Sequence, residues 1–196
     1  MRTNSKQYQI IYADPPWEYN SQGKSKVGDK SKKFRGTTYG QYPYMSLDDI
    51  KSLKIDRISD KNCALFLWIT FPLLPWAFEV MQSWGFRYRT IGFVWIKQNK
   101  NKTPFFGIGH YTKSNSEICL LAIKGSMKVK SNKISQLIFS QREKHSKKPD
   151  IIRDKIVELF GDLPRIELFA RKQNQLFDNF KGWDIWCNET KNDIEL

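Results

Sequence analysis

A short segment near the start of the chain combines an acid, two prolines and a large aromatic residue. Residues 13–17 read ADPPW and directly follow the apolar run YQIIY. A proline has no N–H for a β-ladder and its φ is fixed, so two consecutive prolines end a strand in one rigid shape. The segment therefore holds a carboxylate and an indole ring side by side, either to cap the strand or to form a working site.

One reaction that suits these residues is methyl transfer to the exocyclic amine of adenine. That nitrogen is conjugated with the ring and is a poor nucleophile, so it needs an acceptor that binds its N–H and stabilises the developing cation. Asp14 and the Pro15 carbonyl are two such acceptors, and Pro15 and Pro16 would hold them rigidly. Trp17 offers a face on which an extruded base can stack. From these residues alone, a capped strand end with a surface tryptophan remains the alternative.

The composition indicates a single globular domain over residues 1–196. Hydrophobic residues make up 40% of the chain and aromatic residues 14%, which excludes overall disorder. The longest apolar runs, such as 63–70, are too short to span a bilayer, and the N-terminus lacks a signal-peptide core. Three widely spaced cysteines predict buried, reduced thiols, not metal ligands or disulfides. This use of cysteine predicts a cytoplasmic protein.

The formal net charge of +13 favours a polyanionic partner. Much of the excess lies in residues 19–41 and 124–148, which we interpret as basic substrate loops. Such loops would contact phosphates without reading sequence, and their binding would weaken with salt. The alternative interpretation of the charge is a surface that only maintains solubility. The loop residues that we assign to substrate binding are Lys32, Lys33 and Arg35.

Strand-like and helix-like segments alternate along the chain, which favours an α/β fold with a mostly parallel, doubly wound sheet. Ligands of such sheets bind at the carboxyl ends of the strands, where ADPPW lies. Helices are predicted over 46–53, 72–84 and 149–160 from apolar spacing and from Ser, Pro and Gly at their ends. The predicted strands cover 8–13, 63–70, 90–97, 117–124, 165–170 and 183–187.

The Asp-Pro-Pro-aromatic sequence resembles the catalytic signature of amino methyltransferases that use S-adenosylmethionine. The whole chain resembles the MT-A (messenger RNA adenosine methyltransferase) family of adenine N6-methyltransferases, including its bacterial and phage members. The resemblance implies a Rossmann-like class I methyltransferase fold with permuted motif order, in which DPPW precedes the cofactor-binding strand. The matching segments include YPYMSLDDI (42–50), LFLWIT (65–70), GFRYRTIGFVWIK (85–97), FFGIGHYTKSNSEICLLAIKG (105–125), HSKKPD (145–150), LFGDLPRIELFAR (159–171) and GWDIWCNE (182–189).

The resemblance also implies a site for S-adenosylmethionine. Glu167 interrupts the apolar run RIELFA, where a carboxylate must be paired or ligand-bound, and it is suited to ribose hydroxyls. Lys148 precedes Pro149 at an expected helix start, which suits the carboxylate of the cofactor. A network of polar strand caps and a solvated lysine are the alternatives. The other implied cofactor residues are Phe169, Arg171, Asn174, Asn188 and Glu189.

Three further residues are assigned to the substrate. Tyr42 aligns with a family aromatic that borders the adenine pocket, although core packing is a rival interpretation. His110 occupies a loop position suited to a substrate contact, and Lys113 stands where relatives often carry arginine.

These residues predict an S-adenosylmethionine-dependent N6-adenine methyltransferase that acts on a flipped or unpaired adenine in DNA and needs no metal. DNA is favoured because the chain resembles the bare catalytic domains of the DNA-modifying members of the family. The alternatives are an RNA adenosine methyltransferase and a non-catalytic nucleic-acid-binding subunit of a methyltransferase complex. No membrane partner is expected, and a homodimer or heterodimer stays open.

Overall fold

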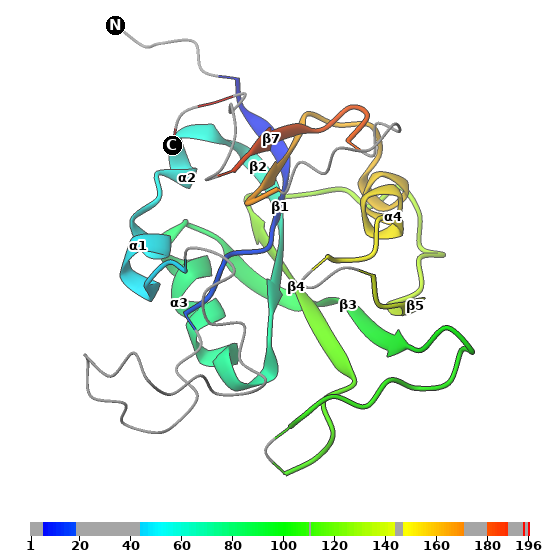
Figure 1. The fold of residues 1–196 in the computed structure, drawn as a ribbon. Helices are drawn as coiled ribbons and strands as arrows, with labels where there is room; N and C mark the ends of the chain where they lie inside the picture. Colours follow the sequence, from blue (N-terminus) through cyan, green and yellow to red (C-terminus); the bar gives the residue numbers. More distant parts are fainter. Residues whose placement is uncertain are drawn as a thin grey trace, which may run out of the picture.

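The structure is a computed structural model that describes residues 6–18, 44–109, 111–143, 147–170, 180–187, 194 and 196. Its centre is a seven-stranded sheet with the strand order β5-β3-β4-β2-β1-β6-β7 (Figure 1). The strands are β1 (Tyr8–Ala13), β2 (Ser59–Ile69), β3 (Arg87–Gln98), β4 (Ser116–Lys124), β5 (Leu137–Gln141), β6 (Arg165–Leu168) and β7 (Asp184–Trp186).

The sheet is mostly parallel, as the sequence predicts. β1 pairs in parallel with β2 and β6, β6 with β7, and β3 with β5. β4 is antiparallel to both of its neighbours, β2 and β3. As a result, β4 begins at the edge of the sheet where the parallel strands end, so the segment that joins β3 to β4 lies at that same edge.

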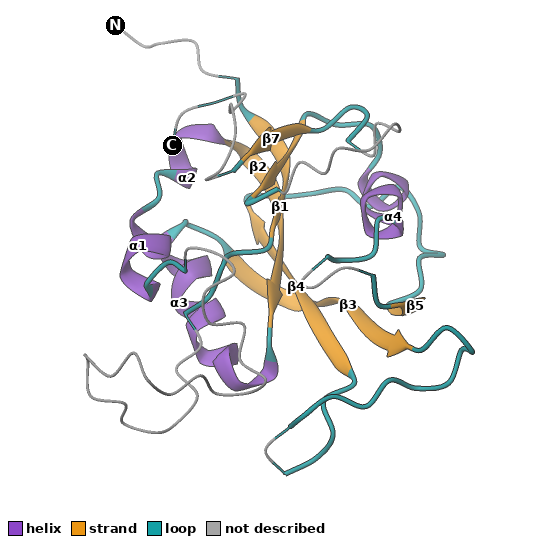
Figure 2. Cartoon of the chain, in the orientation of Figure 1, coloured by secondary structure: helices purple, strands orange, loops and turns teal. Residues whose placement is uncertain are grey.

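Helices cover both faces of the sheet: α1 (Leu47–Ser52), α2 (Ile55–Ile58) and α3 (Leu74–Ser83) lie on one side and α4 (Ile151–Phe160) on the other (Figure 2). The predicted N-cap is present, because the Ser46 hydroxyl accepts from the Asp49 N–H. A 3₁₀ turn, η1 (Phe71–Leu73), precedes α3. α3 ends at Ser83, and Gly85, two residues further on, has a φ of 79° that permits the Phe86 N–H to donate to the Met81 carbonyl. No helix in the described residues is long and apolar enough to cross a membrane.

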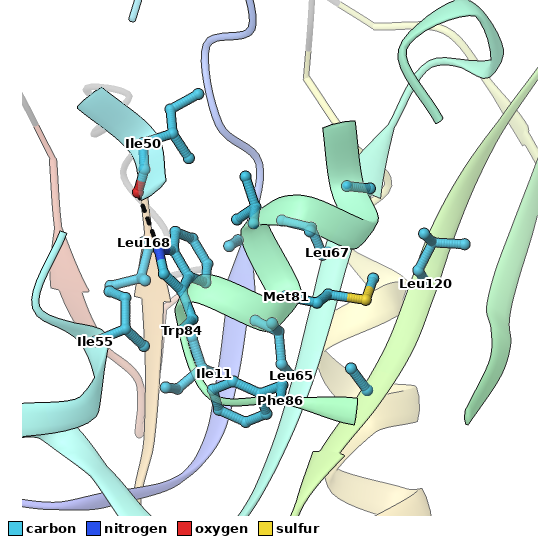
Figure 3. Packing of buried hydrophobic residues seen from close by; sticks show 14 of the residues in the cluster. Ile11, Ile50, Ile55, Leu65, Leu67, Met81, Trp84, Phe86, Leu120 and Leu168 are labelled. Carbon is cyan, nitrogen blue, oxygen red and sulfur yellow. Dashed lines mark hydrogen bonds between the residues drawn. The ribbon is translucent and has the colours of Figure 1, made fainter. Parts of the chain in front are cut away.

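The alternation of side chains along the central strands produces two cores. Ile11, Leu65 and Leu67 face α1 and α3, whereas Ile10 and Phe66 pack in the cluster that contains α4. Both faces of residues 10–13 of β1 and 63–69 of β2 are thus buried, which explains why these segments are continuously apolar in sequence. Figure 3 shows part of the first core, where the buried Trp84 indole donates a 2.9 Å hydrogen bond to the Ile50 carbonyl.

The structure differs from the sequence-based expectation in several elements. β5 lies inside 124–148, so that segment is not simply a loop, and α2 was not predicted. β2 begins four residues earlier than expected, and β6 ends at Leu168 because Phe169 has a φ of 62°. The loop predicted over 19–41 lies wholly outside the described residues. The three cysteines are buried and free, as predicted.

Replacing Trp84 with phenylalanine is expected to lower the free energy of unfolding by about 2 kcal/mol, because it leaves a void and removes a buried hydrogen bond. Urea denaturation followed by circular dichroism measures the change. The matched control is Trp76→Phe in α3, at a partly buried position. An equal loss in the two variants would contradict the importance of the Trp84 contact.

Candidate functional site

Asp14 stands at the carboxyl edge of the middle of the sheet. The last residue of β1, Ala13, is paired with Leu67 on one side and with Leu168 on the other. The chain then turns sharply, because the Trp17 N–H donates to the Pro15 carbonyl at 2.9 Å. A second contact, from the Met45 N–H to the Pro16 carbonyl at 3.0 Å, fixes the turn against the segment before α1. The two prolines therefore set one defined orientation for Asp14.

Trp17 anchors this turn in the core. Its ring is 8% exposed, and its indole N–H donates to the Trp68 carbonyl at 3.0 Å. The Trp68 indole in turn donates to the Tyr12 hydroxyl at 2.7 Å. The alternative of a surface tryptophan is therefore wrong. The indole hydrogen bond anchors the turn, and the predicted stacking on a base stays a prediction.

Lys148 lies against Asp14 although 134 residues separate them in sequence. The Lys148 ammonium is 2.8 Å and 2.7 Å from the two carboxylate oxygens of Asp14 and stands over the Trp68 ring, 5.4 Å from its centroid. Burial acts to lower the pKa of this ammonium, but the carboxylates of Asp14 and Glu117 raise it above its usual value. The solvated lysine of the alternative interpretation is thus excluded.

Two further charges extend this pair into an alternating series. Glu117, in β4, lies 3.4 Å from Lys148 and accepts a 2.5 Å hydrogen bond from Lys97 at the end of β3. Burial acts to raise the pKa of the Glu117 carboxyl, but the two ammonium groups lower it below its usual value. The series Asp14–Lys148–Glu117–Lys97, here called the charge series, places two negative and two positive groups beside the strand ends.

Glu167 forms a separate ion pair. Its carboxylate accepts two hydrogen bonds from the Arg153 guanidinium, at 2.5 Å and 2.9 Å, and the same guanidinium donates to Asp150 at 2.8 Å. Burial raises the pKa of the Glu167 carboxyl, and Arg153 opposes this effect. The expectation that a carboxylate here is paired is confirmed, and its partner comes from α4. The predicted contact with ribose stays a prediction.

The remaining predicted residues divide into those near the strand ends and those outside the described ranges. Phe169 follows β6 directly in the left-handed conformation, and its ring packs edge-on against Trp186. Lys113 is exposed in the segment between β3 and β4. Outside the described residues lie Lys32, Lys33, Arg35, Tyr42, His110, Arg171, Asn174, Asn188 and Glu189.

The site also contains residues that the sequence analysis did not assign. Glu117 and Lys97 were treated only as ends of strands, and Arg153 as part of an amphipathic helix. A signal for each was present, because a charged residue at the end of an apolar strand, or on the partly buried side of a helix, needs a partner of opposite charge. The sequence did not indicate which residue that partner is.

A mostly parallel α/β sheet with an acid-Pro-Pro-Trp turn at a central strand end is consistent with a methyltransferase fold. A comparison with protein families agrees: the MT-A70 family model matches residues 8–188. The chain belongs to this family. The predicted resemblance is confirmed, and the chain is a methyltransferase of the N6-adenine class.

The relatives of the chain differ in how much of their length it covers. It is 35% identical to the Type II methyltransferase M.MunI of a Mycoplasma species, over 97% of this chain and 82% of that one. It is 25% identical to the human N(6)-adenine-specific methyltransferase METTL4, over 94% of this chain and 38% of that one. A putative N(6)-adenosine-methyltransferase MT-A70-like of Medicago truncatula is 26% identical, over 89% of this chain and 25% of that one.

Removing the charge of Glu117 is expected to destabilise the protein. In Glu117→Gln, the buried ammonium groups of Lys97 and Lys148 lose a compensating negative charge. This loss should lower the free energy of unfolding at pH 7 by about 3 kcal/mol. A lowered carboxyl pKa contributes stability above the unfolded value and loses it as the pH falls through the folded value. The difference between wild type and variant should therefore shrink as the pH falls below the ordinary glutamate pKa of 4.5.

Urea denaturation at a series of pH values measures this difference. Glu79→Gln is the matched control, because Glu79 pairs with Lys51 at 3.0 Å on the surface. That change should cost less than about 1 kcal/mol. A pH-independent difference for Glu117→Gln would show that its ionised form does not stabilise the fold.

Proposed function

We propose that this chain transfers the methyl group of S-adenosylmethionine to the N6 amine of adenine in DNA, with Asp14 and the Pro15 carbonyl as the acceptors for that amine. The observation that carries the proposal is the Asp14–Lys148 pair, which places an anion and a cation 2.7 Å apart at the strand end of the DPPW turn. The turn holds the acceptors rigidly, and rigid acceptors are what a poor nitrogen nucleophile requires.

The charges at the site fit the proposed cofactor. An amino acid moiety carries one ammonium and one carboxylate, and Asp14 and Lys148 are complementary to these two groups. Lys148 also lies just before α4, whose first N–H groups favour negative charge. When bound, S-adenosylmethionine supplies an activated methyl group on its sulfonium. The charges of Asp14 and Lys148 are therefore complementary to the methionine end of S-adenosylmethionine.

Asp14 has the acceptor capacity for the proposed role. A carboxylate accepts about four hydrogen bonds in all, and the Lys148 ammonium donates two of those that Asp14 accepts. A carbonyl oxygen has two lone pairs, and the Pro15 carbonyl uses one for the Trp17 N–H. In the proposed reaction these acceptors orient the adenine amine, lower its conjugation with the ring and stabilise the charge that it gains.

Glu167 and the residues after it are proposed to contact the nucleoside part of the cofactor. β6 lies directly beside β1, so Glu167, one residue before the end of β6, is near the same sheet edge as Asp14. If the Glu167 carboxylate exchanged one hydrogen bond from Arg153 for one from a ribose hydroxyl, it would still accept the same number of hydrogen bonds. Because β1 precedes β6 in the chain, this assignment also supports the permuted motif order. Phe169, Arg171, Asn174, Asn188 and Glu189 complete the proposed set.

DNA is proposed as the substrate, bound through the basic loops and Tyr42, His110 and Lys113. The support comes from the match to a Type II methyltransferase across most of both chains. The plant relative named as an adenosine methyltransferase matches over only a quarter of its length. The net charge of +13 suits either nucleic acid.

Asp14→Asn should reduce the rate of methyl transfer at least about a hundredfold, because the amide replaces one acceptor oxygen with a donor. Transfer of labelled methyl groups to DNA at saturating S-adenosylmethionine measures the rate, and calorimetry separately measures the affinity lost with the contact between Asp14 and the cofactor ammonium. Asp48→Asn, an exposed aspartate on α1, serves as the matched control and should keep full activity. Normal methylation by Asp14→Asn would refute the proposed role.

Incubation of the protein with matched duplex DNA, single-stranded DNA and RNA of one sequence tests which nucleic acid is the substrate. Nucleoside analysis after digestion should find N6-methyladenine in DNA. Because phosphate contacts dominate affinity, raising the salt from 50 to 200 mM should weaken binding severalfold or more. Methylation of RNA alone would refute DNA as the substrate, and no transfer to any polymer would favour the non-catalytic alternative.

A further inference from the structure

The segment between β3 and β4, residues 99–115, forms an arm at the edge of the sheet where Asp14 lies. Ile118, near the start of β4, is paired with Ile69, the last residue of β2, so the arm leaves from the carboxyl edge of the parallel strands. Figure 1 shows this segment extending away from the sheet beyond the ends of β3 and β4. Lys113 in this segment belongs to the proposed substrate contacts, whereas the exposed apolar side chains of the segment have no part in the proposed methyl transfer.

Backbone contacts give the arm a defined shape. The Gly107 N–H donates to the Ser114 carbonyl at 2.8 Å, and the Ser114 N–H donates back at 3.3 Å. A Cβ on Gly107 would lie 2.6 Å from the Ser114 carbonyl oxygen, and one on Gly109 would lie 2.0 Å from the Thr112 oxygen. The two limbs approach so closely that both positions require glycine.

The arm is attached to the charge series at its base. The Lys97 N–H donates to the Asn115 carbonyl at 2.9 Å, while the Lys97 side chain contacts Glu117. On the other side, the Arg142 guanidinium lies 3.8 Å from the centroid of the Phe105 ring. The position of the arm is therefore coupled to the groups that hold Lys148 and Asp14.

The far part of the arm exposes large apolar side chains. Phe106, Ile108 and Tyr111 are 64%, 88% and 104% exposed. Single exposed apolar residues are ordinary, but three within six positions form a patch that indicates a binding surface. Lys100, Lys102 and Lys113 accompany the patch, and residues 99–116 contain no aspartate or glutamate. An acid-free, basic and aromatic arm is complementary to a polyanion with flat, apolar bases.

We propose that Phe106, Ile108 and Tyr111 contact unstacked bases next to the target adenine and hold the duplex open around it, while the lysines contact phosphates. This inference rests on the proposed function for its substrate, a nucleic acid. An adenine in a duplex must leave the stack before its amine can reach Asp14, and apolar wedges between base steps provide such an opening. A second protein chain is the rival occupant.

The test uses the full chain with Ile108→Ala and Tyr111→Ala combined. The matched control combines Phe78→Ala and Tyr88→Ala, two exposed aromatic residues outside the arm and outside the proposed substrate loops. A DNA duplex carries 2-aminopurine in place of an adenine that the wild type methylates, because this base fluoresces more strongly when it is unstacked. The wild type and the control should raise the fluorescence on binding, and the arm variant should lose most of that rise.

Methylation kinetics provide a second readout. For a matched duplex, the arm variant should lose at least about tenfold in kcat/KM, since stacking on one side chain contributes that order of affinity. For the same adenine in a mismatched duplex or a single strand, the loss should be less than about threefold. An equal loss on all substrates, or no loss, would overturn the proposal. So would a change in oligomeric state of the arm variant in sedimentation velocity, because it would assign the patch to a protein partner.

The two proposals fail in different ways. If the wild type methylates no DNA but raises the fluorescence of a 2-aminopurine duplex of mixed sequence, and the arm variant does not, the arm is a base-contacting element and the proposed reaction is wrong. If the wild type methylates DNA and the arm variant behaves like the control in both measurements, the reaction stands and the role of the arm is wrong.

Discussion

The cost of burying the Lys148 ammonium is the constraint on which the site depends. An ammonium away from water must lie beside anions, or the segment that carries it moves back into solvent. Asp14 from the end of β1 and Glu117 from β4 provide these anions. One lysine thus brings together the DPPW turn, the antiparallel strand and the start of α4, which are far apart in sequence. The charge series is therefore a structural contact and the proposed reaction centre at once.

The sheet supplies the second condition, a rigid base for charged groups. β1 and β2 are covered on both faces, so Asp14 follows a strand that cannot shift without disturbing two cores. Two hydrogen bonds hold the turn against the core, where Trp17 is buried. The Trp17 indole donates to the Trp68 carbonyl, and the Trp68 indole donates to the Tyr12 hydroxyl. The prolines restrict the backbone, and the tryptophans hold it in place.

The sequence predicts those parts of the fold whose signals are local. β1, α3 and α4 follow from uninterrupted apolar runs or 3.6-residue spacing with Gly or Pro at the ends, and ADPPW and Glu167 stand out because polar residues interrupt apolar strands. β5 is not predicted because it is a five-residue strand at the edge of the sheet, and Leu137 and Phe139 stay exposed within a basic region. The pairing of Glu117 with Lys97 and Lys148, or of Arg153 with Glu167, depends on the strand order, which no local pattern contains.

Two anions around Lys148 also bear on how the proposed cofactor is accommodated. If Asp14 were the sole partner of Lys148, a ligand that bound Asp14 would leave the ammonium without compensation. Glu117 removes this difficulty, because it lies 3.4 Å from Lys148 and is itself held by Lys97. Lys148 can then exchange its contact with Asp14 for the carboxylate of an amino acid moiety while it stays beside Glu117. The acceptor oxygens of Asp14 become available to an ammonium and an amine in the same exchange, which would link cofactor binding to preparation of the nucleophile's site.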